Sequence, residues 1–164
     1  MRPYFCANNS WQQFKEEALS WEGTPYRHYQ AAKKYGADCT MFIGAVYVAV
    51  GILKKISYEY YSRDWHLNTD NPVVENAIQE NFNLNVSDPK LSFKKILCDN
   101  NDWIRGDIAL IHTVKASLAN HASILWEDND TMLHCINHHG VCMTQYNKWW
   151  KRHTRYKIRL FIKD

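Results

Sequence analysis

The amino-acid sequence predicts an α+β domain in which a buried helix packs on an antiparallel sheet of about five strands. Two observations carry this prediction. An apolar run from Thr40 to Leu53 has apolar side chains all around the helical wheel, which is typical of a helix with no solvent-facing side. Short β-rich runs separated by turn-forming residues then recur from about residue 106 to the C-terminus. Helices followed by strands indicate the α+β class rather than a doubly wound α/β fold.

The composition is that of one globular domain spanning residues 1–164. The chain has 164 residues, of which 46% are hydrophobic and 23% are charged. This is enough apolar material for a single core and argues against disorder. The net charge is only +3. Basic residues are densest from Lys148 to Arg159, where aromatic residues alternate with them, a weak sign of a nucleic-acid surface. Basic side chains that flank sheet residues explain the same pattern, so we expect no nucleic-acid partner.

The first expected element is an amphipathic helix close to the N-terminus. Asn9 and Ser10 are residue types that favour a helix N-cap. Apolar residues then recur at helical spacing: Trp11, Phe14, Ala18 and Leu19. The segment Gly23-Thr24-Pro25 that follows combines two helix-breaking residues. We therefore expect the helix to end near Trp21.

Residues 54–102 carry a weaker pattern, and we expect them to form a helical or irregular insertion packed on the main body. The interval contains a tyrosine-rich stretch from Tyr58 to Tyr61, a helical pattern from Pro72 to Phe82 and a link through Asp88-Pro89. The tail of the chain differs, because five β-rich runs there predict the strands of the sheet. They read GDIALIHT, HASILWED, TMLHCIN, GVCMTQY and YKIRLFI.

The cysteine pattern and the N-terminal residues indicate a protein made in a reduced compartment. Five cysteines, an odd number, occur at irregular spacing without a CxxC pair, which does not favour a disulfide framework. The opening residues MRPYFCANNSWQQF lack the basic and apolar segments of a secretory signal. The longest apolar run is shorter than the roughly 20 residues needed to cross a bilayer. We expect synthesis in the cytoplasm, no export signal and no membrane span.

Cys39 stands where Gly36-Ala37-Asp38, interpreted as a turn, meets the long apolar helix. In the first turn of a helix, unpaired backbone N–H groups and the positive end of the helix dipole favour a thiolate. The same N–H groups suit the oxyanion that forms when a thiolate attacks a carbonyl. Cys98, expected within a helix, and Cys135, expected within a strand, lack this advantage. A lone cysteine is more often a packing residue, so position alone leaves both interpretations open.

Two histidines are placed to serve a thiolate nucleophile, which needs a base and an orienting partner for that base. His121 opens one expected strand, and His134 lies toward the end of the next. In an antiparallel hairpin the beginning of the first strand lies beside the end of the second. The two imidazoles are therefore expected side by side, so that one takes the proton of Cys39 and the other fixes its tautomer. Histidines in strands are also common as packing residues, and that interpretation stays open as well.

Several segments occur in a recognisable order and spacing: WEGTPYRHY, YGADCTMFIGAVY, GDIALIHT, NHASILWED and TMLHCINHHGV. Together they resemble the NlpC family of papain-like cysteine peptidases. The likeness runs from about Trp21 to the C-terminus and is weakest in residues 54–102. ALSWEGTPYRH, YYSRDWH and GVCMTQYNKWWKR resemble segments of the branch encoded with phage tails and gene-transfer particles.

This resemblance implies a papain-like fold and a cysteine peptidase that acts without a cofactor or a metal. The implied reaction is hydrolysis of the bond between γ-D-glutamyl and a diamino acid in peptidoglycan stem peptides, through a thioester acyl-enzyme. The resemblance makes Cys39 of GADC the nucleophile, His121 of NHAS the general base and His134 of MLHC the orienting third residue.

The pocket for the free amino end of the substrate falls, by the same resemblance, on Tyr26, Asp38 and Thr40. Asp38 is suited to pair with an ammonium group, and it is equally suited to cap the helix. Thr40 stands where serine is usual in the family. The glycine pair that usually follows the PY segment is replaced by His28-Tyr29-Gln30, which predicts a reshaped substrate cleft.

Alternatives to a Cys-His-His peptidase come from the same tail. The stretch from His134 to Cys142, HCINHHGVC, suggests a zinc-binding domain, although its spacing is not that of a standard finger and strand alternation sends His134 and Cys135 to opposite faces. His138 or His139 could replace His134 as the third residue. The last alternative is a catalytically inactive structural component of a phage tail-like particle, with other particle proteins as partners.

Overall fold

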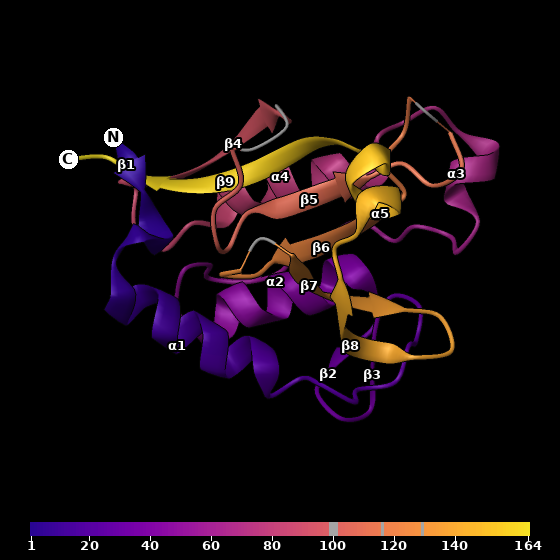
Figure 1. The fold of residues 1–164 in the computed structure, drawn as a ribbon. Coiled ribbons are helices and arrows are strands. Elements are labelled where there is room, and N and C mark those ends of the chain that lie inside the picture. Colours follow the sequence, from indigo (N-terminus) through magenta and orange to yellow (C-terminus); the bar gives the residue numbers. More distant parts are fainter. Residues whose placement is uncertain (99–101, 116, 129) are drawn as a thin grey trace.

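The computed structural model describes residues 1–98, 102–115, 117–128 and 130–164, and within these ranges helices pack on an antiparallel sheet (Figure 1). The helical elements are η1 (Tyr4–Cys6), α1 (Asn8–Leu19), α2 (Cys39–Ala49), α3 (Trp65–Asn68), α4 (Val73–Asn85) and α5 (Lys148–His153). The strands of the main sheet are β1 (Arg2–Pro3), β4 (Leu91–Leu97), β5 (Ile108–Ile111), β6 (His121–Leu125), β7 (Thr131–Ile136), β8 (Gly140–Gln145) and β9 (Thr154–Ile162). A separate two-stranded ribbon joins β2 (Ala31–Ala32) and β3 (Gly36–Ala37).

The main sheet runs in the order β1, β9, β5, β6, β7, β8, and β4 pairs with the other edge of β9. The predicted α+β class is confirmed, and the five predicted strands are β5 to β9. Two strands of the main sheet, β1 and β4, were not predicted. One of them, β4, lies within residues 54–102 and pairs with β9 along all seven of its residues, so this interval contributes to the main sheet as well as to α3 and α4. Whether residues 54–102 are an insertion stays a prediction, and its residues 99–101 lie outside the described ranges.

The two faces of the sheet have different coverings, which follow from the alternation of side chains along each strand. Ile108 and Leu110 of β5 belong to the main core, on the side of α1 and α2. Ala109 and Ile111, the alternate residues, belong to a smaller cluster on the other face with Tyr146 and Trp150. Strand β6 therefore lies between two apolar layers, and the first residue of this strand is His121.

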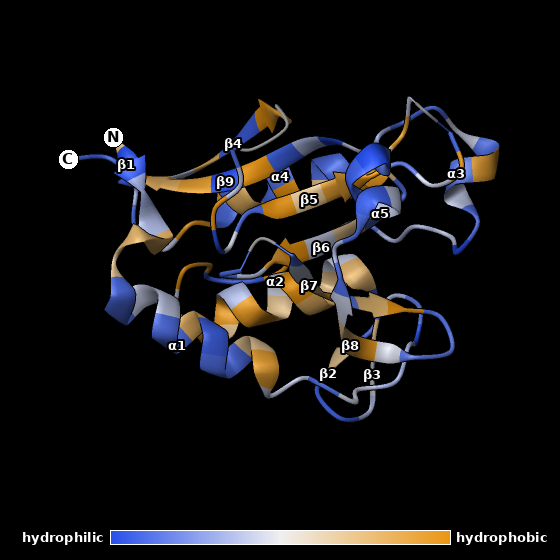
Figure 2. Cartoon of the chain, viewed as in Figure 1, coloured by the Kyte–Doolittle hydropathy of each residue, from blue (hydrophilic) through white to orange (hydrophobic). Residues whose placement is uncertain are grey.

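Helix α2 is the central helix that the apolar run predicts. Phe42, Ile43, Val46 and Tyr47 have no exposed surface, because α2 is enclosed by α1, α4 and strands β6 and β7. Figure 2 shows α2 as apolar along most of its length, whereas α1 carries hydrophilic residues on its outer side. No helix in the described part of the chain is long and apolar enough to cross a bilayer.

Three local predictions were wrong. The N-cap of α1 is Ala7, without a side-chain bond, and Ser10 lies inside the helix with its hydroxyl donating to the Ala7 carbonyl at 3.0 Å. Gly36 and Ala37 form strand β3 rather than a turn, because the chain doubles back on β2 before α2 begins. Cys98 directly follows strand β4 instead of lying in a helix. For Cys98 a tertiary contact overrides the local preference, because its backbone N–H donates to the Arg155 carbonyl at 3.0 Å.

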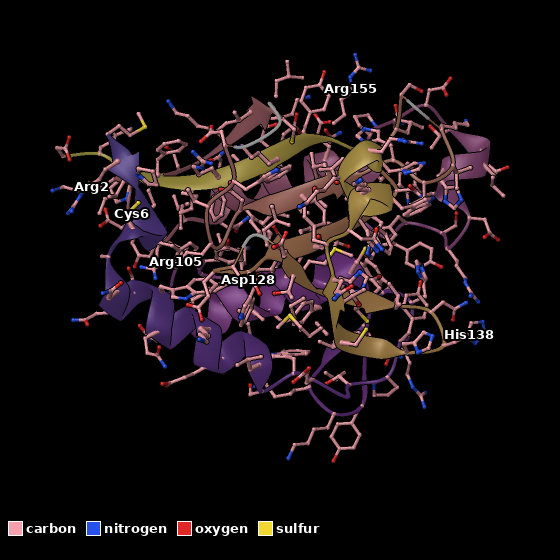
Figure 3. All side chains as sticks on the ribbon, in the orientation of Figure 1. Arg2, Cys6, Arg105, Asp128, His138 and Arg155 are labelled. Atoms are coloured by element: carbon pink, nitrogen blue, oxygen red, sulfur yellow. The ribbon has the colours of Figure 1, made fainter. Side chains whose placement is uncertain are left out.

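A buried charge cluster ties β9 to the start of β5. Arg159 donates to both carboxylate oxygens of Asp107 at 2.8 Å. Lys157 Nζ, with no exposed surface, lies 3.8 Å from Asp107 and 3.4 Å from Asp102. These two cations belong to the basic run that suggested a nucleic-acid surface, yet they point into the protein, whereas Arg155 points outward (Figure 3).

Removing the central carboxylate of this cluster should destabilise the fold strongly. Asp107→Asn leaves Lys157 and Arg159 buried with only the exposed Asp102 as counter-charge, and uncompensated buried charges cost about 3 kcal/mol or more. The matched control is Asp70→Asn, because Asp70 is 93% exposed and pairs with Lys115 at the surface, where such pairs contribute at most about 1 kcal/mol. Urea unfolding followed by tryptophan fluorescence measures both. Equal unfolding midpoints for the two variants would contradict this account of the cluster.

Candidate active site

A cavity of about 340 Å³ opens where α2 begins, and five of the six predicted site residues line it: Tyr26, Asp38, Cys39, Thr40 and His121. The sixth, His134, is fully buried. The site thus combines the first turn of α2 with the ends of β6 and β7. The sequence separates these elements by about eighty residues, and the sheet brings them together.

Asp38 fixes the start of α2 and, with it, the position of Cys39. It is the N-cap of the helix, and its Oδ1 accepts the backbone N–H of Met41 at 2.9 Å. Cys39 is consequently the first residue of α2, as predicted, and lies partly exposed on the cavity wall. The need for a side chain that caps the helix explains why Asp38 precedes the long apolar run in the sequence.

The environment of Cys39 opposes the thiolate that its helix position favours. Burial and the neighbouring Asp38 carboxylate raise the pKa of the thiol to about 12, although backbone N–H groups of Ala122, Thr40 and Cys39 itself act in the opposite direction. The preference for a thiolate that this helix position predicts is therefore outweighed. Desolvation outweighs the helix terminus because water is largely excluded from the sulfur.

His121 and His134 lie side by side as the hairpin geometry predicts. His121 Nε2 and His134 Nδ1 are 2.9 Å apart, and His134 Nε2 lies 2.8 Å from Thr144 Oγ1 of strand β8. Burial, reinforced by His134, lowers the pKa of His121 to about 3, and burial lowers the pKa of His134 to about 4. Both imidazoles are therefore neutral at physiological pH, and so is the Cys39 thiol.

Trp150 covers the two imidazoles from the second face of the sheet. Its ring centroid lies 6.0 Å from that of His121 and 5.4 Å from that of His134. Asn147 positions the tryptophan by capping α5, since its side chain accepts the backbone N–H of Trp150 at 3.3 Å. The sequence does not predict this role, because the WW pair lies in a basic stretch and carries no catalytic pattern of its own.

Tyr61 is a second site residue that the sequence analysis missed. Its hydroxyl donates to Asp38 Oδ2 at 2.7 Å and lies 2.7 Å from Thr40 Oγ1. The segment that carries it packs closely on α2, because a Cβ at Gly44 would come within 2.6 Å of the Tyr58 hydroxyl. Tyr61 belongs to the tyrosine-rich stretch of residues 58–61, and only its repeated aromatic character could have drawn attention to it.

The remaining candidates in the HCINHHGVC stretch are spread apart. His138 and His139 are exposed at the turn between β7 and β8, and His138 points away from the body of the protein (Figure 3). Cys135 faces the opposite side of β7 from His134 and donates its S–H to the Ala37 carbonyl at 3.1 Å. Within the described ranges, no three histidine, cysteine or acidic side chains are grouped to hold a metal ion.

Comparison with solved structures identifies relatives of the fold. A lipoprotein-like NLP/P60 family protein of Staphylococcus aureus is 20% identical, with a TM-score of 0.58 over 96% of this chain and 43% of that one. The NlpC/P60 domain of the peptidoglycan hydrolase SagA is 15% identical, with a TM-score of 0.54 over 90% and 97%. The peptidoglycan hydrolase RipB of Mycobacterium tuberculosis is 14% identical, with a TM-score of 0.54 over 99% and 70%. The chain thus spans less than half of the staphylococcal protein.

The family assignment rests on the sequence itself. No curated protein matches the chain significantly. The model of the NlpC/P60 family, however, matches residues 23–159, a range that includes Cys39, both histidines and every strand from β4 to β8. The predicted family resemblance is confirmed: the chain belongs to the NlpC/P60 family.

Proposed function

We propose that the protein hydrolyses peptidoglycan stem peptides at the γ-D-glutamyl–diamino acid bond, with Cys39 as nucleophile, His121 as base and His134 as orienting residue. The observation that carries the proposal is a single cavity lined by Cys39 and His121, behind which His134 and Thr144 continue a hydrogen-bonded chain. Membership of the family and the peptidoglycan hydrolases among the structural relatives support the substrate class. Partners from a phage tail-like particle stay a prediction of the resemblance.

The chain of hydrogen bonds decides whether His121 can accept a proton. If His134 Nε2–H donates to Thr144, then His134 Nδ1 is an acceptor and His121 Nε2–H donates to it. His121 Nδ1 then carries a free lone pair. The reverse arrangement would place a proton on that nitrogen and remove the base. Thr144 Oγ1 also lies 3.8 Å from Cys142 Sγ, which offers the threonine hydroxyl proton an acceptor in the first arrangement.

The reaction then proceeds from a neutral pair. His121 Nδ1 takes the proton of Cys39 as the sulfur attacks the γ-glutamyl carbonyl carbon, so charge separation coincides with bond formation. Backbone N–H groups around Cys39 stabilise the oxyanion. Collapse of the tetrahedral intermediate breaks the C–N bond, and His121 returns its proton to the leaving amine. Water, activated by His121, then hydrolyses the thioester and restores the thiol.

The amino-terminal side of the stem peptide lies along the wall formed by Tyr26, Asp38 and Thr40. Burial, Cys39 and Asp38 raise the pKa of Tyr26 to about 12, so its hydroxyl remains a hydrogen-bond donor. Arg63 lies over the Tyr26 ring, with its guanidinium carbon 5.8 Å from the ring centroid. The Tyr26 hydroxyl thus provides a neutral hydrogen-bond donor and Arg63 provides a cation, and both suit a peptide that carries carboxylates.

Cys39→Ala should abolish cleavage of purified muropeptides. Loss of the nucleophile lowers kcat by at least about 10³-fold, which mass analysis of the digestion products measures. Cys6→Ala is the matched control, because Cys6 is exposed and lies outside the cavity. Circular dichroism checks that both variants are folded. A folded Cys39→Ala protein that still releases the same fragments refutes the assignment.

The neutral pair predicts how the protein responds to pH. The pKa of Cys39 lies near 12 and that of His121 near 3, so neither group should change its charge between about pH 5 and about pH 9. The difference in ultraviolet thiolate absorbance between the wild-type protein and Cys39→Ala should stay flat over this range. A step with a midpoint below about pH 7 would instead reveal a preformed thiolate–imidazolium pair.

A further inference from the structure

Hydrogen-bond donors of this chain already surround the carboxylate of Asp38. A carboxylate offers about four lone-pair positions. Oδ1 accepts from Met41 N–H at 2.9 Å and from the Thr40 hydroxyl at 3.2 Å. Oδ2 accepts from Tyr29 N–H at 2.8 Å and from the Tyr61 hydroxyl at 2.7 Å. Four donors therefore occupy a group that is only 3% exposed.

Because these donors surround the carboxylate, Asp38 is a poor binding site for an ammonium group. A free amino terminus entering the wall would have to displace either a backbone N–H or the Tyr61 hydroxyl. If it displaced neither, the cation would lose its water without gaining a partner, which is unfavourable. A peptide whose amino terminus is acylated carries no such charge and does not meet this obstacle.

Tyr61 also forms the boundary between the cavity at Cys39 and a second, larger groove. This groove has a volume of about 700 Å³ and lies between residues 55–61 and helix α4. Hydrogen bonds join the two sides of this groove. The Ser57 hydroxyl donates to Asn81 Oδ1 at 2.8 Å, and Asn85 Nδ2 donates to the same hydroxyl at 3.1 Å. Tyr61 lines both spaces, so the two spaces adjoin at this side chain.

The lining of this groove combines apolar side chains, which include Val73, Ala77 and Leu84, with polar groups that suit a sugar. The amide side chains of Asn71 and Asn76 and the carboxylate of Glu80 face it and make no hydrogen bond to other described residues, so they remain available to hydroxyl and acetamido groups. Tyr60 lines the same groove and is 70% exposed. An exposed aromatic ring offers a flat apolar face for the C–H side of a sugar ring.

We propose that the substrate is a stem peptide still amide-linked to its glycan, with Tyr61 excluding a free amino terminus from Asp38 and the groove beside α4 holding the adjoining N-acetylated sugar. The inference rests on the proposed function and specifies its substrate. It replaces the expected pairing of Asp38 with an ammonium group by a structural role for Asp38 and a selective role for Tyr61.

Three defined substrates test the proposal: a stem peptide with a free amino terminus, its N-acetylated form, and the same peptide linked to a disaccharide. The wild-type protein should show the highest kcat/KM on the disaccharide-linked peptide and the lowest on the free peptide, with at least roughly a tenfold difference between these two. Tyr61→Phe frees one acceptor of Asp38 and should raise the rate on the free peptide, relative to the N-acetylated one, by roughly tenfold.

Tyr60→Ala tests the groove separately and should lower the ratio of disaccharide-linked to N-acetylated turnover. Tyr35→Ala is the matched control, because Tyr35 is 76% exposed and lines neither space, and it should leave that ratio unchanged. A wild-type preference for the free peptide, or an unchanged ratio in Tyr60→Ala, overturns the inference while the proposed function stands. Failure to cleave any of the three substrates contradicts both.

Discussion

The buried carboxylate of Asp38 is the constraint on which the candidate site depends. Its hydrogen bonds join the first turn of α2 to two other segments, around Tyr29 and Tyr61. They set where the helix begins and therefore where the Cys39 sulfur lies. Burial of the thiol and, to a smaller extent, the same negative charge raise the pKa of Cys39. Asp38 thus positions the proposed nucleophile and contributes to keeping it protonated.

In the proposed mechanism, activation of the Cys39 thiol therefore depends on the sheet rather than on the helix terminus. A thiol with a raised pKa reacts only if a base removes its proton during the attack. The sheet supplies His121 at the first position of β6, and the next two strands supply His134 and Thr144 behind it. Trp150 closes the opposite side. Because water is excluded, the imidazoles remain neutral, which is the state that can accept a proton.

Much of this architecture could be predicted from the sequence, because it depends on local patterns. The all-apolar run predicts α2, β-rich runs predict five strands, and hairpin geometry predicts that His121 lies beside His134. Strand β4 could not be predicted in the same way, since its membership of the sheet depends on pairing with β9, about sixty residues away. The placement of Tyr61 on Asp38 likewise depends on a long segment folding back over α2. The protonation of Cys39 depends on how the folded chain surrounds the thiol, which no short segment of sequence determines.

Trapping the covalent intermediate tests the central claim most directly. The protein is mixed with a stem peptide, quenched in acid within the first turnover, digested and analysed by mass spectrometry. We expect a thioester that adds the mass of the acyl fragment to the peptide containing Cys39 and to no other peptide. An acyl group on a different residue, or cleavage with no covalent adduct under conditions that preserve thioesters, would contradict the account.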